Sequence, residues 1–221
     1  MLRRAGAFAA PRQPSHFMPE RNDPDAVLAS KWSKWTERES YKRQELVLHL
    51  FIHDTDASIA LQKPPLITFT EIKFDLPASR DLWLAKSATS WRDLYLKSQP
   101  PTAPPPSLME AMHSPESLVQ HTPQIDIQLT TLTLLHGFWG QIHSLLDSKK
   151  FYPSHKATHR LCLLTSHTEL YRDLVSFSSF ISPASHRTIL ISHLLMMILH
   201  APPEDLQRFA GKSGEDEARK T

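Results

Sequence analysis

Residues 32–91 decide the fold and read WSKWTERESYKRQELVLHLFIHDTDASIALQKPPLITFTEIKFDLPASRDLWLAKSATSW. A helical pattern covers about residues 26–60, with large apolar side chains on one face and basic side chains on much of the other. The apolar face holds Trp32, Trp35, Leu46, Leu50 and Phe51, and the basic face holds Lys31, Lys34, Arg38, Lys42 and Arg43. Ser30 or Asp25 is the expected N-cap. Pro64 and Pro65 cannot donate a helical hydrogen bond, so we expect the helix to end before them.

The next two segments differ from this long helix. Residues 66–76 alternate loosely between apolar and polar side chains, which fits a strand or an extended loop that Pro77 closes. Residues 79–97 predict one or two short helices built around Trp83 and Trp91. Residues 99–124 hold seven of the 18 prolines of the chain. Such a segment is typical of a stiff, extended linker, so we expect it not to be packed.

The C-terminal half has a helical pattern throughout. Helices are predicted over residues 125–146, 157–178, 185–200 and 204–210, and Gly211 suits the left-handed position after the last of them. The inward side chains expected in the second of these helices are Leu161, Leu164, Leu170, Leu174 and Phe177. We therefore predict an all-α fold with at most a minor extended segment near residues 66–76. The predicted organisation is an irregular N-terminus (1–25), a first helical part (26–98), a Pro-rich linker (99–124) and a second helical part (125–221).

Composition and charge exclude several classes of protein. The 221 residues carry 25 Lys and Arg against 23 Asp and Glu, so the net charge of +2 gives no strong electrostatic case for nucleic-acid binding by this chain alone. Glu37, Glu39 and Glu45 lie among the basic residues, which predicts a solvated face with ion pairs. The longest apolar stretch, residues 188–201, is shorter than the roughly 18 residues of a membrane span, so we expect no membrane segment.

Candidate catalytic and metal-binding residues are few. The single cysteine, Cys162, lies in the apolar stretch LCLL and is expected to be a buried structural thiol. His155, His159, Cys162 and His167 form the densest group of potential ligands, but a zinc site usually needs a second cysteine, and surface or capping roles are expected instead. No G-x-S-x-G or phosphate-binding glycine motif is present. Asp54 and Asp56 do not establish a catalytic pair. We therefore expect no enzyme activity, catalytic residue, cofactor or metal site.

Residues 32–91 resemble the middle homology region of fungal zinc-finger transcription factors, also called the fungal-specific or xylanolytic-activator domain. The matching residues are Trp35, Glu39, Arg43, Phe51, Asp54, Pro64, Pro65, Glu71, Leu76, Pro77, Leu82, Trp83, Ala85 and Trp91. Residues 200–219 also resemble the continuation of this region in members with two-Cys two-His fingers. The resemblance covers about residues 30–95 well and residues 125–219 more loosely.

The resemblance implies a helical regulatory domain of a nuclear transcription factor. DNA and zinc binding are attributes of the family that depend on zinc fingers or a six-cysteine cluster upstream of this region, and we expect no residue of this sequence to carry them. The resemblance also implies truncation at the C-terminus. The resemblance implies that its partners are other proteins: either the transcription machinery or a paralogous factor. With a paralogous factor, the chain could form a dimer. The alternative is a helical interaction module, or an inhibitor of a full-length paralogue, with no DNA binding of its own.

The residues of the resemblance region have structural roles in this interpretation. We expect Asp54 to accept hydrogen bonds from backbone amides after the turn at Pro64 and Pro65, or to pair with Arg43. Trp83 and Trp91 are expected to bury large areas against the long helix. None of these residues is expected to be catalytic.

Overall fold

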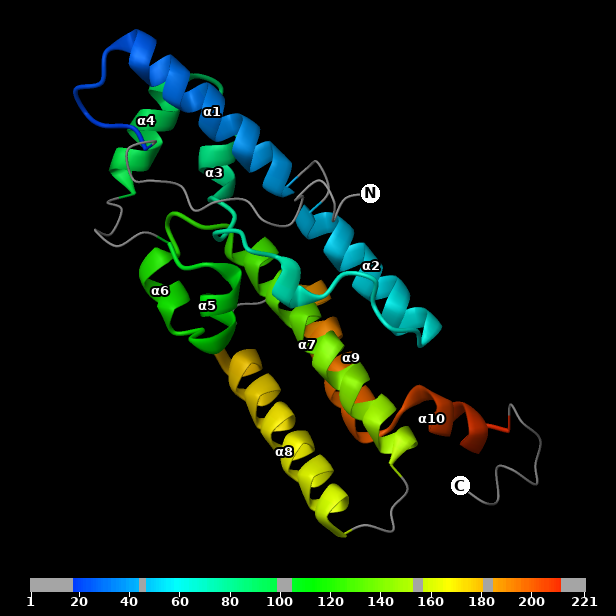
Figure 1. The fold of residues 1–221 in the computed structure, drawn as a ribbon. Helices are drawn as coiled ribbons and strands as arrows, with labels where there is room; N and C mark the ends of the chain where they lie inside the picture. The colour runs from blue at the N-terminus through cyan, green and yellow to red at the C-terminus, as the bar shows by residue number, and fades with distance from the viewer. Residues whose placement is uncertain (1–17, 44–46, 99–104, 153–156, 181–184, 212–221) are drawn as a thin grey trace. The chain divides into compact units, whose positions relative to one another are not determined.

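The computed structural model describes residues 18–43, 47–98, 105–152, 157–180 and 185–211, and their regular structure is helical (Figure 1). Within these ranges β-pairing is limited to two isolated bridges, Asp75 with Ser107 and Ala78 with Ile125. The all-α prediction is therefore confirmed, and its minor extended segment lies where it was expected. The chain forms two compact units, residues 1–137 and 138–221, which divide within one long helix, α7 (Ile127–Phe151).

The long N-terminal helix predicted over residues 26–60 corresponds to α1 (Asp25–Arg43) and α2 (Val47–Leu61); their junction lies outside the described residues. The helical pattern ends before Pro64, as predicted, although a residue other than proline forms the cap. Gln62 adopts a left-handed backbone conformation with φ of 52°. The amide of Lys63 then donates to the carbonyl oxygen of Ser58 at 3.2 Å, which satisfies one of the last carbonyls of α2.

The core of the first unit includes a tryptophan pair. α1 packs against α2 and α4 (Ala88–Lys97), and α3 (Arg80–Trp83) packs against α4. Leu28, Trp35, Leu82 and Trp91 form a buried cluster in which the two indole rings lie 5.3 Å apart. Trp83 is half-buried and packs against this cluster. The two short helices predicted over residues 79–97 are thus confirmed.

Part of the Pro-rich segment is packed, so the expectation of an extended, unpacked linker is wrong for residues 105–124. This part forms α5 (Leu108–His113) and α6 (Ser117–His121), and Leu108 is fully buried. Ser107 caps α5 directly after the prolines, and the amide of Leu108 donates to the carbonyl of Phe74 at 3.1 Å. The extended segment before α3 therefore supplies a backbone partner that the composition of the linker does not reveal. Residues 99–104 lie outside the described residues.

The second unit contains the end of α7 with α8 (Ala157–Phe180), α9 (His186–His200) and α10 (Pro203–Phe209). These helices confirm the predicted segments within a few residues. Leu170, Leu174 and Phe177 are buried as predicted, but Leu161 and Leu164 are 66% and 53% exposed. In this antiparallel pair, His167 of α8 reaches the carbonyl of Leu199 at the end of α9. Residues 157–166 therefore extend past the end of α9, which explains why these two leucines lack the expected cover.

None of the helices in the described ranges is both long and apolar enough to cross a lipid bilayer.

Candidate functional site

The residues that carry the resemblance lie in the first unit, on its N-terminal helices and on the extended segment that follows them. Trp35 and Glu39 are on α1, Phe51 and Asp54 on α2, Pro65, Glu71 and Pro77 between α2 and α3, Trp83 on α3 and Trp91 on α4. The side chain of Arg43 lies outside the described residues, so its predicted pairing with Asp54 stays a prediction. The contacts of these residues decide whether they hold the fold or face a ligand.

Glu39 is a buried carboxylate that binds backbone. The residue is 2% exposed, and its Oε1 accepts a hydrogen bond from the amide of Ala78 at 2.7 Å. Ala78 forms an isolated bridge with Ile125, and the neighbouring amide of Asp126 donates to the carbonyl of Pro77 at 2.8 Å. Glu39 thus fixes the extended segment to α1 at the point where this segment also meets the N-terminal end of α7. The expectation that Glu39 lies on a solvated face is therefore wrong.

Asp54 has the backbone role that the sequence predicted. Its Oδ2 accepts the amide of Ile67 at 2.8 Å, directly after the two prolines. Nearby, the Glu71 carboxylate accepts the amide of Thr68 at 3.3 Å, within the single turn of 3-10 helix η3 (Phe69–Glu71). Phe69 from this turn also lies against Phe51, with ring centroids 5.9 Å apart. The carboxylates of Asp54 and Glu71 therefore order the segment after α2.

Asp56 points to a different partner, so Asp54 and Asp56 do not form a carboxylate pair. The Oδ1 of Asp56 lies 2.9 Å from Nε2 of His136, whose side chain is completely buried on α7. The Nδ1 of the same ring lies 2.7 Å from the carbonyl oxygen of Leu132. The ring of His136 thus lies between two acceptor groups, one on α2 and one on its own helix. This contact joins α2 to α7 across 80 residues of sequence.

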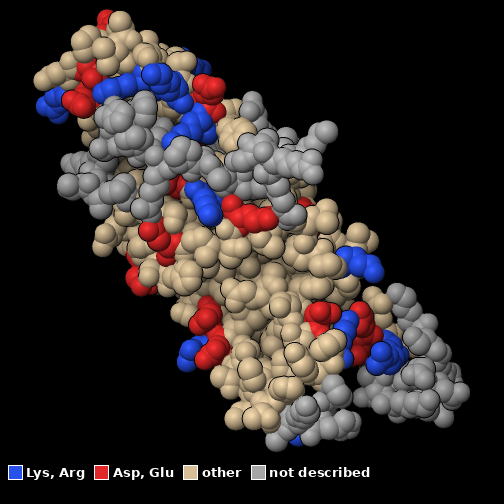
Figure 2. Space-filling model, viewed as in Figure 1, with Lys and Arg blue, Asp and Glu red and all other residues tan. Residues whose placement is uncertain are grey.

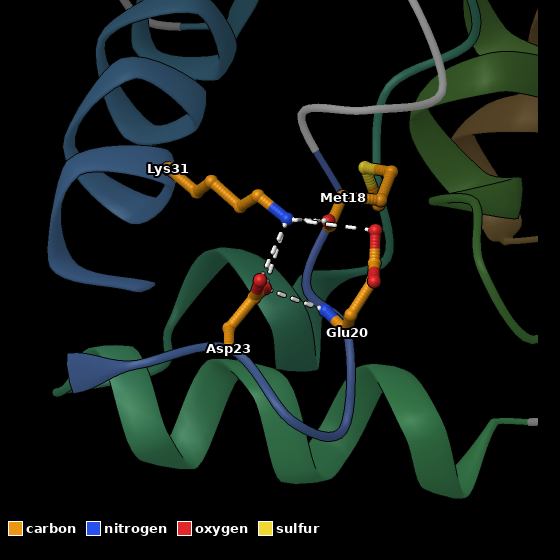
Figure 3. Close-up of polar contacts among 4 residues, drawn as sticks. All are labelled: Met18, Glu20, Asp23 and Lys31. Atoms are coloured by element: carbon orange, nitrogen blue, oxygen red, sulfur yellow. Dashed lines mark hydrogen bonds and ion pairs between the residues drawn. The ribbon is translucent and has the colours of Figure 1, made fainter. Parts of the chain in front are cut away.

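The N-terminal segment before α1 is held by a lysine clamp, shown in Figure 3. The Lys31 ammonium donates to the Met18 carbonyl at 3.2 Å and to both carboxylate oxygens of Asp23 at 3.0 and 2.9 Å. The Glu20 carboxylate lies 3.9 Å from the same nitrogen. The Glu20 amide, followed by Lys31, lowers the pKa of Asp23 because both stabilise the ionised carboxylate. The clamp orders residues 18–24 on α1.

The basic face of α1 is less solvated than its sequence suggests. Arg38 pairs with Asp75 at 3.2 Å, and the side chains of Lys31 and Arg38 are only 14% and 20% exposed. Asp23 and Asp75, the acids that pair with Lys31 and Arg38, both lie outside α1. On the face drawn in Figure 2, the coloured basic side chains lie beside acidic ones and form no continuous basic surface. Phosphate binding would require these ion pairs to be broken.

A groove of about 590 Å³ lies between α7 and α8 in the second unit. No Lys, Arg, Asp or Glu lines this groove. The lining residues are Gly140, Gln141, Ser144, Leu145, Ser148, Tyr152, His159, Cys162, Leu163 and Ser166. The His159 and Tyr152 rings lie 4.6 Å apart. The groove is open to solvent on one side, whereas small-molecule sites enclose most of the ligand surface.

Cys162 is exposed in this groove, so the expectation of a buried structural thiol is wrong. The cause is the same as for Leu161: this part of α8 extends past the end of α9. His159 lines the groove beside Cys162, while His155 lies outside the described residues. Among the residues that the structure describes, no three His, Cys, Asp or Glu side chains gather in a way that could hold a metal ion.

His167 lies apart from this group, in a contact between α8 and α9. Its Nε2 is 3.2 Å from the Leu199 carbonyl, and its ring lies 4.9 Å from that of His200. Burial lowers the pKa of His167, and the positive charges of Lys149 and His200 lower it further, while the Leu199 carbonyl opposes them. His167 therefore contributes to the contact between α8 and the end of α9.

Two features of the molecule had no signal in the sequence. The Asp56–His136 pair joins residues that no motif or spacing connects. The groove depends on the position of α8 beside α7. The buried position of Glu39 could have been suspected, because it falls four residues after Trp35 on the apolar side of the helix.

No protein-family model, curated protein sequence or solved structure matches the chain.

Proposed function

We propose that the chain is a regulatory domain of a fungal transcription factor that acts in the nucleus through contacts with other proteins. One observation carries this proposal beyond the resemblance: Glu39 and Asp54, two polar residues of the resemblance, bind backbone amides at 2.7 and 2.8 Å. Polar residues that belong to a structural scaffold are expected to bind backbone amides in this way. Residues that mark a catalytic site are expected to face an open cavity.

The aromatic residues of the same region support the proposal independently. Trp35 and Trp91, at the two ends of the resemblance, meet in one buried cluster. A sequence pattern whose ends meet in the core is typical of a domain signature rather than of a short binding motif. DNA and zinc binding would belong to another part of such a factor, because Lys31 and Arg38 on the basic face of α1 are paired with acids.

Tethering to DNA tests the proposal. The chain is fused to a DNA-binding domain of known site, and transcription of a reporter carrying that site is measured in a fungal host. A regulatory domain should raise or lower reporter output severalfold relative to the DNA-binding domain alone. The Glu39→Ala variant should lose this effect, whereas Glu37→Ala, which changes an exposed residue on the same helix, should keep it. Unchanged output from a fusion of equal nuclear abundance would refute the proposal.

The alternative, an inhibitory interaction module, is favoured by the apolar side chains exposed on α8, α9 and α10. Leu161, Leu190 and Phe209 are 66%, 66% and 71% exposed. In this case the untethered chain, without any DNA-binding domain, should lower the output of a promoter driven by a full-length paralogous factor. The tethered chain would leave its own reporter unchanged, so the two functions give opposite results in the two assays.

A further inference from the structure

An uncharged face runs along the outer side of α8. We call it the outer face; it consists of Leu161, Leu164, Thr168, Tyr171 and Val175, which are all exposed. Steps of three, four, three and four residues place them on one stripe of the helix. The buried residues of α8, such as Leu170 and Leu174, occupy a different stripe that packs inside the second unit. α8 therefore has two apolar stripes, of which only one is covered by other residues that the structure describes.

The outer face continues onto α9. Tyr171 lies 4.8 Å from the ring of His200 at the end of α9, and that helix exposes Ile189 and Met197 by 42% and 46%. None of the residues of the outer face, nor these three of α9, is Lys, Arg, Asp or Glu.

The exposed apolar area suffices for an interface. Leu161, Leu164, Tyr171, Val175, Ile189 and Met197 are exposed by 66, 53, 39, 40, 42 and 46%. At about 200 Å² for a large side chain, they expose on the order of 550 Å², near the upper limit for a patch on a monomer. With all of this area covered, two copies would bury about 1,100 Å² together, just above the roughly 1,000 Å² that a specific interface should clear and below the roughly 1,200–2,000 Å² of a standard one.

The order of side chains along α8 matches a second copy of the same helix. The outer face is nearly symmetric about Thr168: Leu164 and Tyr171 lie four and three residues from it, and Leu161 and Val175 each lie seven residues from it. In an antiparallel pair with its two-fold axis at Thr168, Leu164 would face Tyr171 of the other copy, and Leu161 would face Val175. The small threonine at the axis allows close approach. The five residues of the outer face carry no formal charge, and the exposed Arg160 and Arg172 border the face.

We propose that the chain forms a two-fold symmetric homodimer through the outer face of α8, with Thr168 at the axis and α9 contributing to the edge of the interface.

Sedimentation equilibrium of the full chain tests the dimer. The wild-type chain should show a reversible monomer–dimer equilibrium. Thr168→Arg brings two positive charges together at the axis and should weaken the dimer at least tenfold. Ser176→Arg adds the same charge at an exposed position of α8 outside the outer face and should leave the equilibrium unchanged. Mixing Thr168→Arg with Thr168→Glu should restore a dimer, because opposite charges then meet at the axis.

Disulfide trapping gives a second readout that needs no charged substitution. Since Cys162 is the only cysteine of the chain, the variant Cys162→Ser/Thr168→Cys carries one thiol at the axis. Mild oxidation should link it rapidly into a covalent dimer, whereas Cys162→Ser/Ser176→Cys should stay monomeric. A wild-type chain that remains monomeric at all concentrations would overturn the proposal, whether the face binds another protein or another part of the chain. Equal trapping at both positions, or a dimer that a folded Thr168→Arg variant retains, would also overturn it.

Discussion

Replacing Glu39 by alanine should destabilise the first unit strongly. The substitution removes the acceptor 2.7 Å from the amide of Ala78 and empties a site where the side chain is 2% exposed. A hydrogen bond to a charged group contributes about 1.5–3 kcal/mol. The one buried methylene group that is lost, Cγ, adds roughly 0.8 kcal/mol. The expected loss in the free energy of unfolding is therefore about 2–4 kcal/mol, a large part of the stability of a small domain.

Urea unfolding followed by tryptophan fluorescence measures this loss, because four of the five tryptophans lie in the first unit. Glu37→Ala is the matched control, since it removes an exposed glutamate from the same helix and should change stability by less than about 0.5 kcal/mol. Glu39→Gln keeps an oxygen acceptor without its charge and should fall between the two. If Glu39→Ala and Glu37→Ala unfolded at the same urea concentration, the anchoring role assigned to Glu39 would be refuted.

Three further predictions concern α7 and α8. Gly137→Ala should lower the melting temperature, because a Cβ at that position would lie 2.9 Å from the Phe69 ring, whereas Gly140→Ala meets nothing within 4 Å and should gain up to about 1 kcal/mol of helix stability; equal shifts in the two would contradict this packing. Cys162 should react with a thiol reagent as fast in the native protein as in urea, and strong native protection would contradict its exposure in the groove. Stability should fall as the pH drops below about 6.5, the ordinary histidine pKa, because the lowered pKa of His167 makes the unfolded chain bind more protons. His167→Gln should flatten this pH dependence of the melting temperature, and an unchanged slope would refute the assignment.

Local sequence signals predicted the helices well. The helix over residues 185–200 is confirmed as α9, with Ser185 as its N-cap, and the following helix ends before Gly211, whose φ is 82°. The role of Asp54 was also predictable, because an acidic side chain near the end of a helix can reach the amides that follow a proline turn. In each of these places the determining partners are close in sequence.

Predictions failed where the determining partner is distant in sequence. Leu161 and Leu164 have an apolar helical spacing like that of Leu170, yet only Leu170 has α9 beside it. Spacing shows which side of a helix is apolar, but not how far the neighbouring helix extends. Leu108 follows a run of prolines that is typical of an unpacked linker, and it is buried because Phe74 supplies a backbone partner. Composition cannot reveal such a partner.

Amide hydrogen exchange at Ile67 and Ala78 tests most directly the central claim that polar residues of the resemblance region hold the backbone of a regulatory scaffold. In the native chain both amides should exchange slowly, because they donate to Asp54 and Glu39 at 2.8 and 2.7 Å. Asp54→Ala should release the first amide and Glu39→Ala the second. Fast exchange at both amides in a folded wild-type chain would contradict the claim, since these carboxylates would then be available to a ligand.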